Sequence, residues 1–328
     1  MKKKSRFSLP VLLPLLLVGL FNLNSCSLSR NGVTDRVNPY PARGKTTAGK
    51  LFVWEINLGK KKSYILGSLH FFKKESYPLA ETIEKAYSQS DVLIVETLVE
   101  PTKRVSITLA KGIYPADDPR TLENQVNPAT YRSVQERLQK SHMDIRLFAK
   151  FKPWYLAQTL AIMNIMKAGF HPGSGIDVYF LEKAKEKKEI LALEKLEEQI
   201  DFYDRFPPRV NEAYLLANLQ TSSGSGLENL EMEHLTAAWS AGDTRAVERL
   251  LLREIQKKPY LEILYEKLIY ERNRNMTERI AGHLNTPGKR FFFVVGAYHL
   301  VGKRGILRLL KEKGFQLNQL YEIKESRI

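Results

Sequence analysis

The chain has 328 residues, of which 43% are hydrophobic and 27% charged, so it carries enough apolar side chains to bury a sizeable core. Its Lys and Arg residues exceed its Asp and Glu residues by 15. The single cysteine, Cys26, excludes an internal disulfide framework and any zinc or iron–sulfur site built from several cysteines.

Residues 1–25 have the pattern of a secretory signal peptide. Basic residues at positions 2–6 precede an apolar stretch, 9–21, which at 13 residues is shorter than the roughly 20 that a membrane-spanning helix needs. The segment ends in Leu23-Asn24-Ser25-Cys26, which resembles the bacterial lipobox, where the cysteine receives diacylglycerol. We therefore predict a lipoprotein signal peptide over 1–25, a lipidated Cys26 and an extracytoplasmic protein held at a membrane.

Residues 26–48 are rich in Ser, Asn, Arg, Gly, Pro and Thr and have no apolar periodicity, which predicts a flexible tether. The signal peptide holds four of the 15 surplus positive charges, so a surplus of 11 remains after it. An exported chain meets lipid head groups more often than nucleic acid, and no nucleic-acid-binding motif is present. We expect the membrane, through the N-terminal lipid, as a partner, and no nucleic acid.

The folded domain is predicted over 49–328, and it begins with a hairpin. Two β-prone runs, Leu51–Ile56 and Ser63–Leu66, are separated by the turn-like Asn57-Leu58-Gly59-Lys60. The second run leads into Gly67-Ser68-Leu69-His70. Pro78 then opens a helical stretch, and Asp91–Glu96 has the composition of a buried strand.

The same order of elements returns near the C-terminus. A strand over Phe291–Val295 precedes Gly296-Ala297-Tyr298-His299, a helix over Ile306–Lys313 and a strand over Phe315–Tyr321. The two Gly-x-x-His segments lie 229 residues apart in matching contexts, which indicates a duplicated half-unit. We predict an α/β fold with a mixed central sheet made by two related half-units, each with a Gly-x-x-His turn, and with surrounding helices.

A helical insertion, at about 120–285, is expected between the half-units. The segments 121–166 and 227–271 have helical periodicity, with Pro153 and Trp154 opening a buried helix. A third strand candidate, Glu189–Glu194, follows a lysine-rich helix over Val178–Lys188. The order of the strands in the sheet cannot be derived from this pattern.

Four polar side chains stand at or just after strand ends: His70, Glu96, Glu194 and His299. Ligands of open α/β sheets bind beyond the carboxyl ends of the strands, so these four could converge on one site. Each alone could equally be a polar residue that ends a strand and faces solvent. The glycines that open the two Gly-x-x-His motifs would allow a sharp turn and a close approach of the backbone to a ligand.

These motifs together resemble the TraB/GumN family, which includes the Tiki-type metalloproteases and is distantly related to erythromycin-esterase-like and ChaN-like proteins. The resemblance covers roughly 51–321, with Ser68 in place of the Thr usual in the family. Its landmarks are Tyr64-Ile65-Leu66-Gly67-Ser68-Leu69-His70, Val95-Glu96, Lys152-Pro153-Trp154, Gly175-Ile176-Asp177, Leu193-Glu194 with Gln199, Glu271-Arg272-Asn273 with Met276, and Val295-Gly296-Ala297-Tyr298-His299-Leu300-Val301-Gly302.

The resemblance implies a hydrolytic site around the two Gly-x-x-His motifs, and metal-dependent peptide cleavage is the activity of its Tiki branch. Two neutral imidazoles and one carboxylate suit Mn²⁺, Co²⁺, Fe²⁺ or Zn²⁺ with positions left for water. We propose His70, Glu96 and His299 as the ligands of such an ion. A bound ion would activate water, so no side-chain nucleophile is required.

Two further acidic residues are candidates for catalysis. Glu194 and Asp177 could each act as general base, as an additional ligand, or as a group that orients an imidazole. Asp177 could instead cap the helix that follows Gly175-Ile176.

Arg272 and Tyr298 complete the candidate catalytic residues. Arg272 could stabilise a developing oxyanion or pair with Glu96, and the alternative is a surface ion pair with Glu271 or Glu278. Tyr298 could donate a hydrogen bond to a reaction intermediate, or it could be a packed aromatic residue.

Three functional classes follow from the sequence. The first is a lipid-anchored, metal-dependent hydrolase that acts on peptides or proteins outside the cytoplasm. The second is a metal-free, esterase-like hydrolase with His70 or His299 as general base, which sensitivity to a chelator would distinguish from the first. The third is a non-catalytic lipoprotein that binds a ligand or partner.

Overall fold

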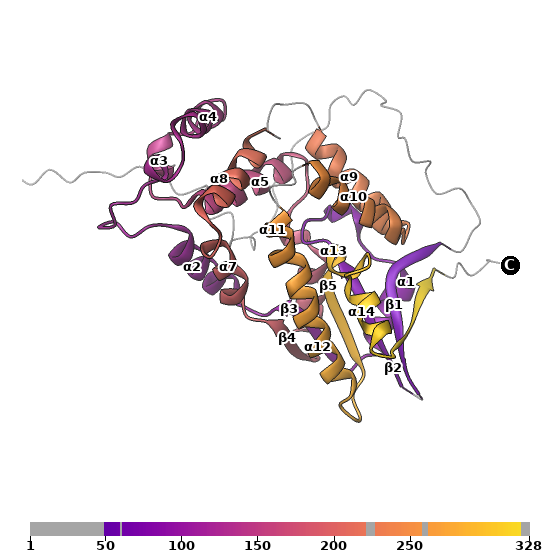
Figure 1. Ribbon diagram of the computed structural model, residues 1–328. Coiled ribbons are helices and arrows are strands. Elements are labelled where there is room, and N and C mark those ends of the chain that lie inside the picture. The colour runs from indigo at the N-terminus through magenta and orange to yellow at the C-terminus, as the bar shows by residue number, and fades with distance from the viewer. Residues whose placement is uncertain (1–48, 60, 221–226, 258–261, 323–328) are drawn as a thin grey trace, which may run out of the picture.

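The computed structural model describes residues 49–59, 61–220, 227–257 and 262–322 (Figure 1). The predicted signal peptide, Cys26 and the tether lie outside the described residues. The strands are β1 (Lys50–Leu58), β2 (Lys61–Ser68), β3 (Val92–Thr97), β4 (Glu189–Glu194), β5 (Phe291–Gly296) and β6 (Gln316–Tyr321).

In the described ranges, the helices lie between β2 and β6 along the chain. The α-helices are α1 (Glu81–Ser88), α2 (Pro101–Gly112), α3 (Leu122–Gln125), α4 (Pro128–Gln139), α5 (Pro153–Lys167), α6 (Ile176–Ala184), α7 (Leu196–Asp204), α8 (Pro208–Gln220), α9 (Leu227–Ser240), α10 (Thr244–Lys257), α11 (Glu262–Tyr265), α12 (Arg272–Leu284), α13 (Ala297–Leu300) and α14 (Ile306–Glu312). Short 3₁₀ segments are η2 (Lys74–Ser76), η3 (Ile145–Phe148) and η4 (Pro172–Ser174), and η6 (Glu266–Glu271) is a π-helix.

One mixed sheet with the strand order β4-β3-β5-β2-β1-β6 organises the fold. β5 pairs in parallel with both β2 and β3, and β3 pairs in parallel with β4. β1 is antiparallel to both of its neighbours. The predicted α/β class with a mixed sheet and surrounding helices is therefore confirmed.

The sequence located most of the sheet strands to within a few residues. The N-terminal hairpin forms as predicted, with both strands longer than expected, and Gly59 turns the chain with a positive φ of 67°. The helix expected from Pro78 begins three residues later, at Glu81. The second Gly-x-x-His motif is not an open turn, because Ala297 to Leu300 form the helical turn α13.

The two half-units share the order strand, Gly-x-x-His, helix, parallel strand, but they occupy different places in the sheet. The first runs from β2 to β3, which flank β5, whereas the second runs from β5 to the edge strand β6, beyond β2 and β1. The two half-units therefore have the same order of elements along the chain, but their strands have different neighbours in the sheet.

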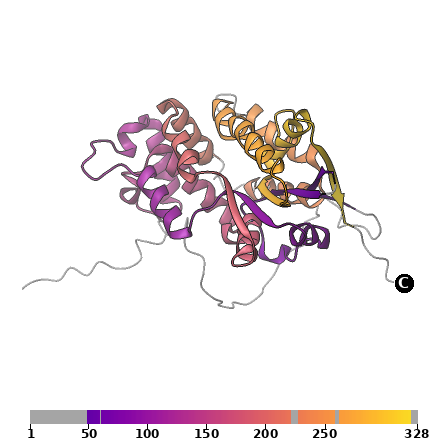
Figure 2. The same cartoon turned by 90° about the horizontal axis from the view of Figure 1, so that it is seen from below.

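Some of the helices between β3 and β5 pack on the sheet, and the others form a separate helical part beside it. They begin at Pro101, before the expected position 120, and β4 interrupts them by joining the sheet. Figure 2 shows the helices α2 to α5, α7 and α8 gathered at one end of the molecule, and an apolar cluster around Leu122, Phe148, Trp154 and Leu215 fills this end. A separate cluster packs on the sheet around Phe292, Phe293 and Val53. Within the described ranges, none of the helices is long and apolar enough to cross a membrane.

Candidate functional site

The polar residues predicted at strand ends lie together at one edge of the sheet. β2, β3, β4 and β5 are mutually parallel, and the register pairs Ser68 with Gly296 and Thr97 with Glu194, so all four strands end at the same level. His70 follows β2, Glu96 is the last but one residue of β3, Glu194 ends β4, and His299 lies in α13 directly after β5. Parallel pairing thus gathers residues that are more than 200 positions apart.

Gly296 is the point at which the two motifs meet. A Cβ atom on this residue would lie 3.1 Å from Glu96 Oε1, 3.4 Å from His299 Cδ2 and 3.5 Å from His70 Nε2. The Gly296 N–H donates to Glu96 Oε1 at 2.6 Å. A residue without a Cβ therefore lets the backbone bond the carboxylate and leaves space bordered by both imidazoles.

Gly67, in the first motif, has a different role from the one expected. It lies inside β2 opposite Val295, and a Cβ here would come within 2.4 Å of the Phe52 ring. The residue is small because Phe52 packs on the sheet, not because the chain turns. Its carbonyl accepts a hydrogen bond from Trp239 Nε1 at 2.5 Å, which ties α9 to the base of the first motif.

A buried arginine joins two of the carboxylates. Arg272 Nη2 donates to Glu96 Oε2 and to Glu194 Oε2, both at 2.7 Å, and Nε donates to Glu194 Oε2 at 3.0 Å. All three side chains are at most 10% exposed. Burial alone raises the pKa of Glu96, but the neighbouring imidazoles, Arg272 and the Gly296 N–H outweigh it and hold this pKa well below its usual range. The predicted pairing with Glu96 is observed, and the alternative of a surface ion pair is wrong.

His299 is held in one orientation by Asn273. Asn273 Nδ2 donates to the carbonyl of Arg304, so its Oδ1 is the atom that faces His299 Nδ1, at 2.6 Å. The proton therefore belongs on Nδ1, which leaves Nε2 with a lone pair 3.8 Å from Glu96 Oε1. Burial, assisted by the charge of Arg272, lowers the pKa of His299 to about 3 against the opposing effect of Glu96, so the ring is neutral at pH 7.

His70 is paired with Asp177, and the start of α6 explains why. The Ile176 N–H donates to the Leu69 carbonyl at 3.0 Å, and a Cβ on Gly175 would lie 2.5 Å from the His70 carbonyl oxygen. Asp177 Oδ1 thereby comes to 3.3 Å from His70 Nδ1. Asp177 is the second residue of α6, whose N-cap is Gly175, so the predicted capping role is wrong.

The charge of His70 depends on these neighbours. Desolvation disfavours the imidazolium, but the carboxylates of Asp177 and Glu96 outweigh it and raise the pKa of His70 to about 9. The side chain is nevertheless 52% exposed, in contrast to the buried His299. The two imidazoles of the site thus differ in charge and in access to solvent.

The remaining predicted residues have definite positions. Glu194 is engaged by Arg272 and accepts a hydrogen bond from Gln199 Nε2 at 2.9 Å, so its described contacts stabilise the arginine. Tyr298 is half-buried and packs against the apolar core on the sheet, as in the packed-aromatic alternative. Neither position by itself assigns a catalytic role.

Sequence reasoning gave no role to two residues of this site. Asn273 is fully buried against His299, and its signal was only its place beside Arg272 in a motif. Arg104 reaches the site from α2, where its Nη2 donates to Thr97 Oγ1 at 2.9 Å. No sequence pattern distinguishes Arg104 from the other basic residues of its helix.

The side chains of this site are of the types that bind divalent ions, but they are not already grouped as a metal-binding set. Each imidazole has its Nδ1 facing an oxygen, that of Asp177 or Asn273, an arrangement typical of metal-binding histidines. Both oxygens of Glu96 already accept hydrogen bonds. In the part of the chain that the structure describes, no three His, Cys, Asp or Glu side chains are grouped as a metal-binding set.

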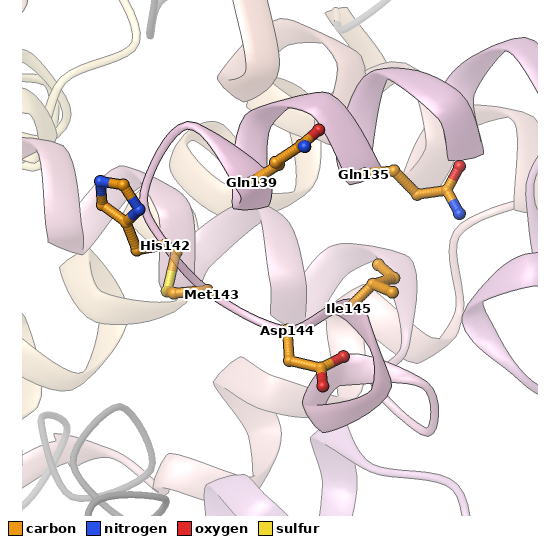
Figure 3. Close-up of a pocket in the computed structure, with 6 residues that line it drawn as sticks. All are labelled: Gln135, Gln139, His142, Met143, Asp144 and Ile145. Atoms are coloured by element: carbon orange, nitrogen blue, oxygen red, sulfur yellow. The ribbon is translucent and has the colours of Figure 1, made fainter.

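A surface hollow of about 550 Å³ lies on a different part of the molecule, between α4 and η3, and is lined by Gln135, Gln139, His142, Met143, Asp144 and Ile145. Figure 3 shows that His142 and Asp144 point in different directions. The Asp144 carboxylate instead pairs with Arg146. This hollow therefore presents no cluster of reactive groups.

The fold and these motifs define a member of a known family. The chain belongs to the TraB/PrgY/gumN family, whose profile matches residues 52–319. Uncharacterized protein YbaP of Shigella flexneri and of Escherichia coli strain K12 are each 24% identical to it over 268 residues, which is 80% of this chain and 94% of theirs. The resemblance stated from the motifs is thus confirmed.

The chain is also distantly related to the TIKI metalloproteases. Metalloprotease TIKI1 of Danio rerio is 27% identical over 164 residues, which covers 43% of this chain and 33% of that protein. The Metalloprotease TIKI homolog of Amphimedon queenslandica is 37% identical over 60 residues. No solved structure matches the chain significantly.

Proposed function

We propose that this protein is a metal-dependent hydrolase that cleaves peptides or proteins. The observation that carries the proposal is the meeting of His70, Glu96 and His299 around Gly296. The partial similarity to the TIKI metalloproteases supports it.

His70 Nε2, His299 Nε2 and Glu96 Oε1 are the atoms that would hold the ion. When bound there, a divalent ion would lower the pKa of its water and polarise the scissile carbonyl. Because His70 is exposed, it is the side chain most free to complete the set. Because its pKa lies near 9, binding at Nε2 would release a proton.

The other residues would orient and balance this set. Asn273 keeps the proton of His299 on Nδ1, and Asp177 holds Nδ1 of His70. Arg272 bonds Oε2 of Glu96, the oxygen that the Gly296 N–H does not use, and neutralises part of the charge of Glu194. The buried guanidinium thereby sets the direction of the Glu96 carboxylate.

Metal titration of the purified full-length chain tests this proposal. We expect calorimetry to find one site for Mn²⁺, Co²⁺, Fe²⁺ or Zn²⁺, and a His70→Ala, His299→Ala double variant to lose about 100-fold or more in affinity. His142→Ala, a histidine on the surface hollow, is the control and should bind as the wild type does. Cleavage of a peptide library should stop with a chelator and return when the ion is restored.

A metal-free hydrolase is the second candidate, and the occupied oxygens of Glu96 favour it. The neutral His299 would then act as general base, since His70 is protonated at pH 7. Chelator-resistant cleavage with no metal bound would establish this alternative. Absence of both binding and cleavage would leave a ligand-binding lipoprotein.

We further propose that the protein is anchored outside the cytoplasm by lipid on Cys26. The support is the sequence Leu23-Asn24-Ser25-Cys26 behind an apolar segment. Cys26→Ser should abolish labelling by a palmitate analogue and move the protein out of the membrane fraction. Unchanged labelling would refute the anchor without touching the proposal for the site.

A further inference from the structure

Two arginines approach the carboxyl edge of the sheet from different helices. Arg272 comes from α12 and bonds Glu96 and Glu194. Arg104 comes from α2, on the long helical segment after β3, and its Nη2 bonds the hydroxyl of Thr97. Thr97 directly follows Glu96 in β3, so Arg104 bonds the residue next in sequence to the carboxylate at the centre of the site.

Arg104 differs from Arg272 in that it contacts no carboxylate of the residues that the structure describes. Within the described ranges its side chain makes one hydrogen bond, to Thr97, and no ion pair. Burial lowers the pKa of Arg104, while Asp177 and Glu96 oppose this effect, so both carboxylates act on it through space without contacting it. The group remains charged, since an arginine is not deprotonated in proteins.

A partly buried cation with unused donors is costly unless something pairs with it. Several other arginines of this chain have a carboxylate within 2.7 Å, including Arg120, Arg290 and Arg304. A guanidinium offers parallel N–H donors whose spacing matches a carboxylate, and such bidentate pairs are among the strongest in proteins. The free donors of Arg104 therefore suit a carboxylate that comes from outside the chain.

We infer that Arg104 binds a carboxylate of the substrate, so that the preferred peptides carry this group close to the bond that is cut. The carboxylate as a ligand follows from Arg104 itself, while its place in a peptide rests on the proposed function. Arg104 would thus determine specificity without taking part in bond cleavage.

The carboxylate can come from the C-terminus of a peptide or from an acidic side chain, and matched probes separate these sources. One pair is a fluorescein-labelled alanine pentapeptide as free acid and as amide. The other is an amidated pentapeptide with glutamate or glutamine at its centre. Fluorescence anisotropy with the purified full-length protein gives the Kd of each probe, and product analysis gives kcat/KM.

We expect the acidic member of one pair to bind the wild type about tenfold or more tightly than its neutral counterpart. Arg104→Gln should bring that ratio to within about twofold while the Kd of the neutral probe stays unchanged, and Arg104→Lys should retain part of the preference. Lys103→Gln removes the charge of the exposed neighbour in α2 and should keep the wild-type ratio.

Three results would overturn the inference. The first is a wild type that binds both members of each pair equally well. The second is an Arg104→Gln variant that binds both members of a pair more weakly by the same factor. The third is an Arg104→Lys variant that also weakens the binding of both members by the same factor. Preference in binding without any cleavage would refute the peptidase and keep the role of Arg104. Cleavage without a preference in binding would refute the role of Arg104 and keep the proposed peptidase.

Discussion

Removal of Arg272 is the sharpest test of how the site is built. Arg272→Met keeps much of the apolar stem but leaves Glu96 and Glu194 buried without their shared cation. Breaking a buried ion pair by removing one partner costs about 3–5 kcal/mol. At roughly 2–4 °C per kcal/mol for a domain of this size, the melting temperature should fall by roughly 6–20 °C.

The effect of pH follows from the carboxylate. The pKa of Glu96 in the folded protein lies below its ordinary value of 4.5, so its stabilising contribution is present above that value and is lost as the pH falls through the folded pKa. Without Arg272 this lowering weakens. The deficit of the Arg272→Met variant should therefore be largest above about pH 5 and shrink on acidification.

Urea denaturation followed by circular dichroism at pH 7 and at about pH 3, below the ordinary pKa of Glu96, measures both effects. Arg274→Met is the matched control, because Arg274 lies two residues further along α12 and makes an exposed ion pair with Glu266, worth at most about 1 kcal/mol. Adding Glu194→Gln to Arg272→Met should restore about 1–3 kcal/mol by removing one uncompensated charge. A loss no greater than that of Arg274→Met, or one independent of pH, would refute the reasoning.

Two further predictions concern the space between the motifs. Gly296→Ala places a methyl group 3.1 Å from Glu96 Oε1 and should abolish metal binding measured by calorimetry. Gly282→Ala is the control, because nothing lies within 4 Å of its added Cβ. This variant should bind the metal normally, and its free energy of unfolding in urea should rise by up to about 1 kcal/mol. Equal binding by both variants would show that the close approach at Gly296 is unimportant. His70 should titrate near pH 9 by NMR, and Asp177→Asn should move this pKa down towards 6.5. Because the folded pKa is the higher one, the stability from this pair should be complete below about pH 6.5 and lost as the pH rises through 9. A wild-type pKa near 6.5 would contradict the pairing.

The sequence predicted helices and strands best where an apolar pattern coincided with a strong local signal such as a proline. The strands at Glu189–Glu194 and Phe291–Gly296 follow from continuous apolar runs, and Pro153 opens α5 as expected because proline lacks the N–H that the first helical turn does not use. Local signals were weaker for helix starts, so the helix expected at Pro78 begins at Glu81. The role of Gly67 depends on Phe52, whose place against it no local pattern describes.

The amino-acid sequence by itself determined the class of fold, the family and the identity of the residues at the strand ends, because strand runs and short motifs are local properties of the chain. Only the tertiary structure decided which partners these residues have. Arg272 joins two carboxylates, Asn273 fixes the tautomer of His299, and Arg104 bonds Thr97 and contacts no carboxylate of the described residues. The reason is that burial and charge pairing depend on which parallel strands end side by side at one edge of the sheet. The order of the strands in the sheet is not determined by the sequence of any one strand.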